Sequence, residues 1–199
     1  MVTLVINPGS SSKKYAFYRG TESVLTARFE RTGEGFGRSV ELRNEQLHQD
    51  EVTVHTYRDA LHEVIGLART NGVISSVADI TTVAVRVVAP GTFFQTHRII
   101  DEGFIGKLLR LESVLPLHVP ATLEEIAAAK SLLAHTTLVG VSDSAFHSTI
   151  PEIHHRYSAR DAAGLEIRRY GYQGISVASV KSRLPAVVKE PGKRVVVAH

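Results

Sequence analysis

The 199-residue chain contains no cysteine, which excludes disulfide bonds and metal sites built on thiolates. It also has no apolar run that approaches the length of a membrane span, so the sequence predicts no membrane partner. The apolar segment Val2–Ile6 is too short for the layout of a secretion signal, and we expect a cytoplasmic protein. Repeats and low-complexity segments are lacking as well.

Long clusters of one charge are missing too. The formal net charge is +3 and the sequence pI is about 9.3, but the basic residues are scattered in runs no longer than two, such as Lys13-Lys14. This scatter argues against a nucleic-acid partner. A mildly basic surface is equally suited to small molecules that carry phosphate.

The composition is that of a soluble globular protein, with 43% hydrophobic and 22% charged residues. The length allows one large domain or two small ones with a buried core.

Apolar runs and turn residues predict strands first and alternating helices and strands later. The expected strands are Val2–Ile6, Tyr15–Tyr18, Ser23–Phe29, Ser39–Leu42 paired with Glu51–Val54 across 44–50, Thr82–Val88, Thr137–Val141 and Arg194–Ala198. The expected helices are 57–70, Asp101–Glu112, Pro120–Leu133 and Ile175–Leu184, and loops are expected at Arg31–Arg38 and 144–170. This order predicts an α/β fold with a mixed β-sheet and helices on both faces.

The turn after the first expected strand, Asn7 to Ser12, is a candidate phosphate site. Glycine lets the backbone approach a ligand, and turn amides with serine hydroxyls can cradle phosphate oxygens. Lys14 adds a positive charge, and Asn7 is placed to hold a magnesium ion or its water. The same residues are also ordinary β-turn chemistry, so spacing alone leaves both interpretations open.

Four other stretches place polar side chains where strands end or loops are rigid. Arg86 lies inside an apolar strand, where its fork suits a carboxylate, a phosphate or a structural acid. His118 stands between two prolines, either as a rigidly held catalytic imidazole or as a packed loop residue. Asp143 and His147 follow another strand, and residues 168–174 form a loop rich in Arg, Tyr and Gly. Each also has an ordinary structural explanation, including caps and solvated charges.

Taken in order, these five stretches resemble the acetate kinase family, part of the acetate and sugar kinase, Hsp70 and actin superfamily. NPGSSSKK at 7–14 is similar to the family's Asn-Ala-Gly-Ser-Ser-Ser-x-Lys. RVVAPG at 86–91 is similar to Arg-Val-Val-His-Gly-Gly, and PLHVP at 116–120 to Pro-Leu-His-Asn-Pro. DSAFH at 143–147 is similar to Asp-Thr-Ala-Phe-His, and RRYGYQG at 168–174 to Arg-Arg-Tyr-Gly-Phe-His-Gly.

The resemblance implies a ribonuclease H-like (actin-like ATPase) domain and a phosphotransferase. Its substrates would be ATP and a short-chain carboxylate, such as acetate, propionate or butyrate, with Mg²⁺ as cofactor and an acyl phosphate as product. The implied roles are metal binding for Asn7, phosphate or ATP binding for Ser10, Ser12 and Lys14, carboxylate binding for Arg86, an alkyl pocket for Val88 and Leu117, and catalysis for Asp143, His118 and Gln173.

Departures from the family pattern fall beside this implied site. Gln173 replaces a histidine that supports the transition state, and a glutamine donates a hydrogen bond without carrying charge. Ala89 and Pro90 replace His and Gly, Val119 replaces Asn, and 175–177 replace Thr-Ser-His. The loss of donors predicts altered or lost activity.

In the family, the adenosine pocket, a second arginine and an acidic magnesium partner lie beyond the segment that matches VVVAH at the end of this sequence. We therefore expect residues 1–199 to be an N-terminal domain that is inactive alone. The C-terminal nucleotide-binding domain, or a second copy in a homodimer, would be its partner. The alternative is a non-catalytic binding or assembly module that kept the fold.

Overall fold

The computed structural model describes residues 1–9, 11–32, 35–43, 45–52, 57–160, 166–188 and 195–197. The chain forms two compact units. The first consists of Met1–Arg86 with Arg98–Val141, and the second of Val87–His97 with Ser142–His199. Among the described residues, no helix is both long enough and apolar enough to span a bilayer.

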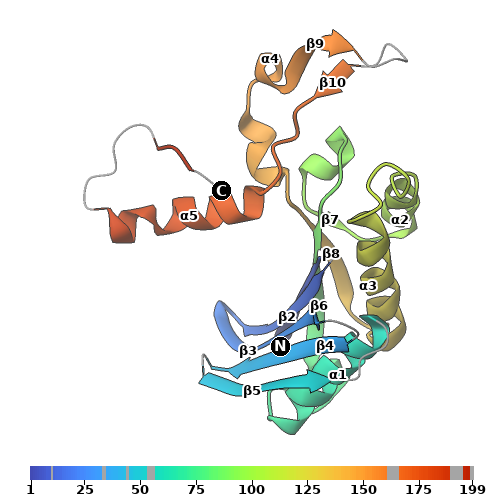
Figure 1. The fold of residues 1–199 in the computed structure, drawn as a ribbon, viewed down its shortest axis with the longest axis vertical. Helices are drawn as coiled ribbons and strands as arrows, with labels where there is room; N and C mark the ends of the chain where they lie inside the picture. Colours follow the sequence, from blue (N-terminus) through green and yellow to red (C-terminus); the bar gives the residue numbers. More distant parts are fainter. Residues whose placement is uncertain are drawn as a thin grey trace. The chain divides into compact units, whose positions relative to one another are not determined.

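A mixed eight-stranded sheet dominates the first unit (Figure 1). Its strands are β1 (Val2–Pro8), β2 (Ser12–Arg19), β3 (Glu22–Thr32), β4 (Gly35–Leu42), β5 (Glu45–Val52), β6 (Ile80–Val87), β7 (Arg98–Ile99) and β8 (Thr137–Ser142), in the spatial order β5-β4-β3-β2-β1-β6-β8-β7. The strands β1 to β5 form successive antiparallel pairs, whereas β1 and β6 are parallel. The predicted α/β class with a mixed sheet is confirmed. Helices were expected on both faces, whereas the described helices of the first unit pack against one face only.

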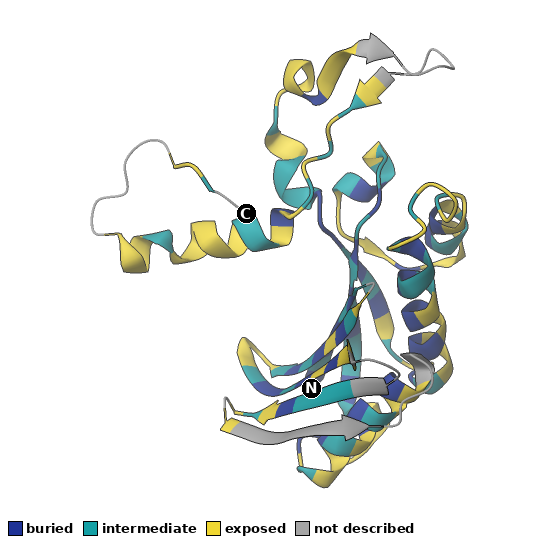
Figure 2. Cartoon of the chain, viewed as in Figure 1, coloured by how far each residue is buried: buried dark blue, intermediate teal, exposed yellow. Residues whose placement is uncertain are grey.

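Helices cover one face of this sheet within the first unit. They are α1 (Tyr57–Thr70), α2 (Glu102–Leu109) and α3 (Val119–Leu132), with a short 3₁₀ turn η1 (Val77–Asp79) before β6. The helix α1 contacts β2, β3 and α3, and α3 contacts β1. Alternate strand residues, such as Leu4, Ile6 and Phe17, are fully buried. Buried positions alternate with more open ones along the strands of this sheet (Figure 2). The alternation of buried and open positions gives each strand a second, more polar face.

Several short elements and one longer helix, α5, make up the second unit. They are the 3₁₀ turns η2 (Thr92–Gln95) and η3 (Ala145–Thr149), the helix α4 (Glu152–His155), the antiparallel pair β9 (Arg156–Arg160) and β10 (Glu166–Arg168), and the helix α5 (Gly174–Val187). The expected loop over 144–170 is therefore partly wrong, because these pieces are too short to leave a periodic apolar pattern. The helix α5 is longer than expected at both ends.

The structure corrects three other expectations. Part of the expected loop at 31–38 is strand, because β4 begins at Gly35 and pairs with β3 from Thr32 opposite Gly35 onward; residues 33 and 34 lie outside the described part. The pairing across 44–50 is also wrong, since Leu42 pairs directly with Glu45 and β5 fills most of that segment. Residues 195–197 of the expected last strand have no strand structure, and the flanking residues 194, 198 and 199 are outside the description.

Candidate functional site

The serine turn between β1 and β2 is closed by a short backbone contact. The Gly9 amide donates to the Ser12 carbonyl at 2.9 Å, and the Arg31 amide of β3 donates to the Ser11 carbonyl at 3.2 Å. A Cβ atom added to Gly9 would lie 2.7 Å from the Ser12 oxygen, so only glycine fits this closure. Ser10 lies outside the described residues.

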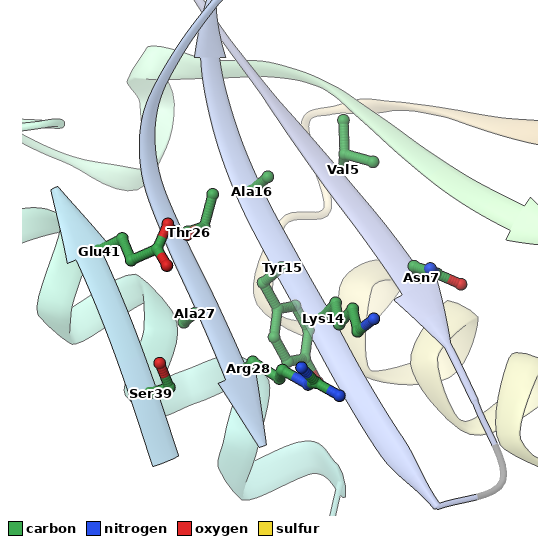
Figure 3. Close-up of a pocket in the computed structure, with 10 residues that line it drawn as sticks. All are labelled: Val5, Asn7, Lys14, Tyr15, Ala16, Thr26, Ala27, Arg28, Ser39 and Glu41. Carbon is green, nitrogen blue, oxygen red and sulfur yellow. Dashed lines mark hydrogen bonds between the residues drawn. The ribbon is translucent and has the colours of Figure 1, made fainter. Parts of the chain in front are cut away.

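A row of polar side chains crosses the open face of the sheet from this turn (Figure 3). In direct register, Asn7 lies opposite Lys14, Lys14 opposite Arg28, and Arg28 opposite Ser39. Neighbouring strands are ~4.8 Å apart, so each of these groups is within reach of the next. They border a depression of about 380 Å³. Its lining is completed by Val5, Tyr15, Ala16, Thr26, Ala27 and Glu41.

Arg86 of β6 joins this row beside Asn7. Its Nη1 donates to the Asn7 Oδ1 at 3.2 Å, because the parallel pairing of β1 and β6 places the two side chains next to each other. The structure thus brings together three of the predicted residues, Asn7, Lys14 and Arg86. A guanidinium has five donors in a planar fork, so a single arginine can make several hydrogen bonds at once.

Asn7 is a modest ligand for magnesium. Its amide oxygen already accepts from Arg86, although an amide oxygen has two lone pairs. Across the residues that the structure describes, no group of three or more acidic or histidine side chains is placed to hold a metal ion. Magnesium commonly binds through one or two protein oxygens plus substrate phosphates and waters. Asn7 therefore fits a magnesium ion that is held mainly by a phosphate ligand.

His118 occupies the N-cap of α3. Its carbonyl accepts from the Thr122 amide at 3.1 Å and from the Thr122 hydroxyl at 2.9 Å, and its side chain is half-buried. Val119, which stands where the family pattern has asparagine, is fully buried. Leu117, expected to line an apolar pocket, is 68% exposed. The other residue expected there, Val88, is half-buried and belongs to the second unit.

Asp143 forms hydrogen bonds to two separate segments of the second unit. It is 2% exposed, and its amide donates to the Val87 carbonyl at 3.0 Å. Its carboxylate Oδ2 accepts from the backbone amide of Gln173 at 2.8 Å, and its carbonyl accepts from the backbone amide of Gly174 at 2.8 Å. Within the second unit, Asp143 thus links Val87 to the start of α5 and brings two predicted stretches together.

The loop before α5 has an unusual backbone. Gly171, Tyr172 and Gln173 have φ values of 91°, 55° and 53°, three left-handed residues in succession. The His147 Nε2 lies 2.7 Å from the Tyr172 carbonyl, which can only accept, so Nε2 carries the proton. Such conformations cost free energy and persist only where the surroundings impose them. Here Asp143 and His147 hold the loop, and the Gln173 side chain is exposed.

The arginines of the RRYGYQG stretch have structural partners. Arg168 forms a two-pronged ion pair with Glu152, with N–O distances of 2.6 and 2.9 Å, and Arg156 adds a third bond at 3.0 Å. These bonds lower the pKa of Glu152 to about 2. Arg169 stacks over the Tyr157 ring at 5.3 Å. The ordinary explanation, a charged pair at the surface, holds for Arg168.

Sequence reasoning missed other residues at these sites. Arg28 was recoverable in principle, because it alternates onto the open face of β3 in register with Lys14. The role of Ser142 was not recoverable from the sequence, because its contacts are distant along the chain. Its hydroxyl donates to the Phe94 carbonyl, and its backbone amide donates to the His97 Nδ1 at 3.1 Å. Ser144 next to it is 1% exposed.

Comparisons with known proteins cover nearly the whole chain. The sequence profile of the Acetokinase family matches residues 2–199. An acetate kinase of Streptomyces coelicolor is 34% identical over 207 residues, covering 98% of this chain and 50% of that protein. An acetate kinase of Sulfurovum sp. is 30% identical over 193 residues, covering 96% of this chain and 49% of that protein. The chain spans about half the length of the curated relatives it matches.

Two solved structures have the same fold. The acetate kinase of Porphyromonas gingivalis aligns with a TM-score of 0.80 and 28% identity, over 96% of this chain and 49% of that one. A propionate kinase of Francisella tularensis aligns with a TM-score of 0.78 over 95% and 49% of the two chains; at 22% identity this likeness concerns the fold alone.

Proposed function

We propose, from the premise that this chain belongs to the Acetokinase family, that residues 1–199 take part in phosphoryl transfer from ATP to a short-chain carboxylate. Family membership and the α/β fold of the actin-like ATPases are the ground for this proposal. The observation that carries it is the bond between Arg86 and Asn7 beside Lys14, directly at the end of the serine turn. Phosphoryl transfer needs cations and hydrogen-bond donors around the transferring group, and Arg86 and Lys14 would supply cations there.

Arg86 is the group proposed to bind the carboxylate. A planar guanidinium matches a carboxylate with two parallel hydrogen bonds, which a lysine cannot reproduce. The bond to Asn7 fixes the direction of the guanidinium before the substrate arrives. Val88 and Leu117 are proposed to contact the alkyl group of acetate, propionate or butyrate.

The serine turn is proposed to hold the phosphates of ATP. Its amides, the hydroxyls of Ser10 and Ser12, and the Lys14 ammonium would bind oxygens of the transferred group. Asn7 would hold the magnesium ion, which would neutralise charge on the phosphates. In the reaction a carboxylate oxygen bonds to the γ-phosphorus while the bond from that phosphorus to the ADP oxygen breaks. The carboxylate is already ionised at neutral pH, so no base is needed.

His118, Asp143 and Gln173 are proposed to orient the transferring group. The Asp143 carboxylate accepts from the backbone amide of Gln173, which fixes the direction of the carboxylate. The Gln173 side chain can donate a neutral hydrogen bond where the family pattern has histidine. Because a neutral donor stabilises spreading negative charge less than a cation does, we expect a slower chemical step than with histidine.

We further propose that residues 1–199 form the N-terminal domain of the reaction centre. The adenosine of ATP would be bound by a nucleotide-binding domain or by a second copy, in the cytoplasm. A second candidate function is a non-catalytic binding module. The burial of Ala89 and Val119 favours it, because these apolar residues stand where the family pattern places donors.

The decisive experiment mixes this chain with the C-terminal half of the Streptomyces coelicolor acetate kinase, the half that this chain does not cover. Acyl phosphate is trapped with hydroxylamine in the presence of ATP, magnesium and acetate, propionate or butyrate. Turnover that disappears with Arg86→Gln supports the kinase proposal. Acetate binding without turnover, together with a stable complex of the two halves, would favour the binding module.

A further inference from the structure

Two adjacent lysines of β2 point to opposite faces of the sheet. Lys14 is exposed on the open face, whereas Lys13 is 0% exposed on the face that packs against the helices. Lysine is almost never fully buried unless it is paired. The burial of Lys13 therefore calls for a partner and for an explanation. The proposed function does not supply one, because it uses only the neighbouring Lys14.

The partner of Lys13 is Glu125 of α3. The Lys13 Nζ lies 3.0 Å from the Glu125 Oε1 and donates to the Ala121 carbonyl at 3.3 Å. The Tyr15 hydroxyl donates to the same Oε1 at 2.7 Å. Like Lys13, Glu125 is 0% exposed, and its pairing with Lys13 joins residues 112 positions apart.

Burying this ion pair between β2 and α3 costs free energy, because both charged groups lose their hydration. Loss of hydration on burial lowers the pKa of Lys13 and raises the pKa of Glu125, and their mutual attraction opposes both shifts. The Glu125 Oε2 has no hydrogen-bond partner among the described residues. Buried ion pairs are often no more stabilising than apolar residues of similar volume, so stability alone does not explain this one.

The location of the pair offers a better explanation. Lys13 directly follows Ser12, whose carbonyl closes the serine turn. Its bond to Ala121 reaches the first turn of α3, which begins right after His118 at the N-cap. A single side chain thus connects the proposed phosphate turn to the helix end that carries His118.

We propose that Lys13 and Glu125 are positioning residues that fix the serine turn and His118 relative to each other. The phosphate-related part of this inference rests on the proposed function. Hydrogen bonds from Nζ to a carboxylate and a carbonyl define one register of β2 on α3, whereas apolar contacts permit several. Neither residue touches substrate in this scheme.

The test uses the 199-residue chain and three variants. Lys13→Met leaves the buried carboxylate alone, and Lys13→Met/Glu125→Leu replaces the whole pair with apolar groups. The matched control is Lys130→Gln/Glu102→Gln, which removes an exposed Lys–Glu pair between α3 and α2. Urea unfolding measures global stability. Amide hydrogen exchange is followed at Gly9 in the turn, at Thr122 beside His118, and at core amides of β6. Inorganic phosphate is titrated against the amide signals of the turn.

We expect Lys13→Met to unfold at lower urea and the double variant to recover most of that loss. In the double variant, amide exchange at Gly9 and Thr122 should still rise about tenfold relative to β6. Local opening there no longer requires breaking the bonds of Lys13 to Glu125 and Ala121. Its phosphate affinity should fall several-fold, while the exposed-pair control matches the wild type.

Wild-type exchange and wild-type phosphate affinity in the double variant would overturn the inference and leave the pair a purely structural one. If the wild-type chain binds no phosphate at the turn but exchange at both sites still rises, the positioning role stands and the proposed phosphate site fails. The two failures are therefore distinguishable.

Discussion

Arg86 illustrates how one side chain acquires a role from its neighbours. An arginine in an apolar strand is ambiguous in the sequence, because a structural acid would satisfy it as well as a ligand would. The structure places its Nη1 3.2 Å from the Asn7 amide oxygen, which is a neutral acceptor. A charge held in this way on the open face of the sheet is well suited to a small anion.

We predict that Arg86→Lys weakens acetate binding by the 199-residue chain about tenfold or more, because a lysine cannot form the two parallel bonds worth roughly 1.5–3 kcal/mol. Binding is measured by isothermal titration with acetate. The control is Arg69→Gln, which removes an exposed positive charge at the end of α1. Equal acetate affinities of Arg86→Lys and the wild type would mean that the carboxylate binds elsewhere.

Glu152 is the residue for which a pH dependence follows from the structure. Hydrogen bonds from Arg168 and Arg156 lower its pKa from 4.5 to about 2. A carboxyl group with a lowered folded-state pKa stabilises the fold above its unfolded pKa, and that contribution is lost as the pH falls through the folded value. The relevant window therefore runs from about pH 4.5 down to about pH 2.

We predict that acidification through this window loosens the ends of β9 and β10, and that Glu152→Gln shows the loosened state already at neutral pH. The side-chain NMR signals of Arg168 and the carboxyl carbon of Glu152 report both events. A Glu152 carboxyl that titrates near pH 4.5 would show that the arginine bonds do not persist in solution.

At the scale of elements, the loop before α5 is defined by steric exclusion. A Cβ atom on Gly171 would lie 2.2 Å from the His147 Cδ2, and the φ of 91° is itself unfavourable for any other residue. One on Gly174 would lie 2.5 Å from the Asp143 carbonyl oxygen. The chain thus passes close to Asp143 and His147 only because glycine occupies these positions.

We predict that Gly171→Ala destabilises the second unit by well over ~1 kcal/mol, since it combines backbone strain with a clash. The matched control is Gly20→Ala, where φ is also positive at 60° but no atom lies within 4 Å of the added Cβ. Gly20→Ala should cost only the backbone term, about 1 kcal/mol. Thermal unfolding compares the two. If they lose equal stability, the contact with His147 contributes nothing, and a partial rescue of Gly171→Ala by His147→Ala would confirm the clash.

Elements also show where sequence patterns suffice and where they fail. The buried strand β1 and the amphipathic helix α1 were predictable, because regular alternation and helical periodicity mark them directly. Gly35 and Gly37 misled the prediction of β4, because strand pairing with β3 outweighs the weak strand preference of glycine. The burial of Lys13 was not predictable, since its partner Glu125 is distant in sequence and two adjacent lysines look alike.

At the scale of the whole molecule, the candidate site was predictable only where regular strand patterns place its residues. The pairing of β1 with β6 makes Asn7 and Arg86 neighbours, and strand ends of this kind are recognisable from the sequence. The contact of Asp143 with Gln173 depends on three left-handed residues that no local pattern announced. The five-motif resemblance supplied the roles, which remain predictions for every one of these side chains.

The proposed division of labour leads to the last prediction, that residues 1–199 alone have no appreciable kinase activity. Phosphoryl transfer requires donor and acceptor in line, and a misplacement of about 1 Å can cost roughly 100-fold in rate. Loss of an arginine that stabilises the transferring group can cost on the order of 10³-fold or more. In our proposal the adenosine contacts and one such arginine come from another domain, and Gln173 already replaces a charged group with a neutral one.

The measurement is acyl phosphate formation by the purified chain with ATP, magnesium and acetate, trapped with hydroxylamine at several protein concentrations. We expect rates far below the ~1 s⁻¹ that marks the slow end of ordinary enzymes, at every concentration. Acetate binding through Arg86 should survive, because that group needs only the first unit. Turnover near 1 s⁻¹ that grows more steeply than linearly with protein concentration would contradict the prediction, since it would mean that two copies of this chain complete the site together.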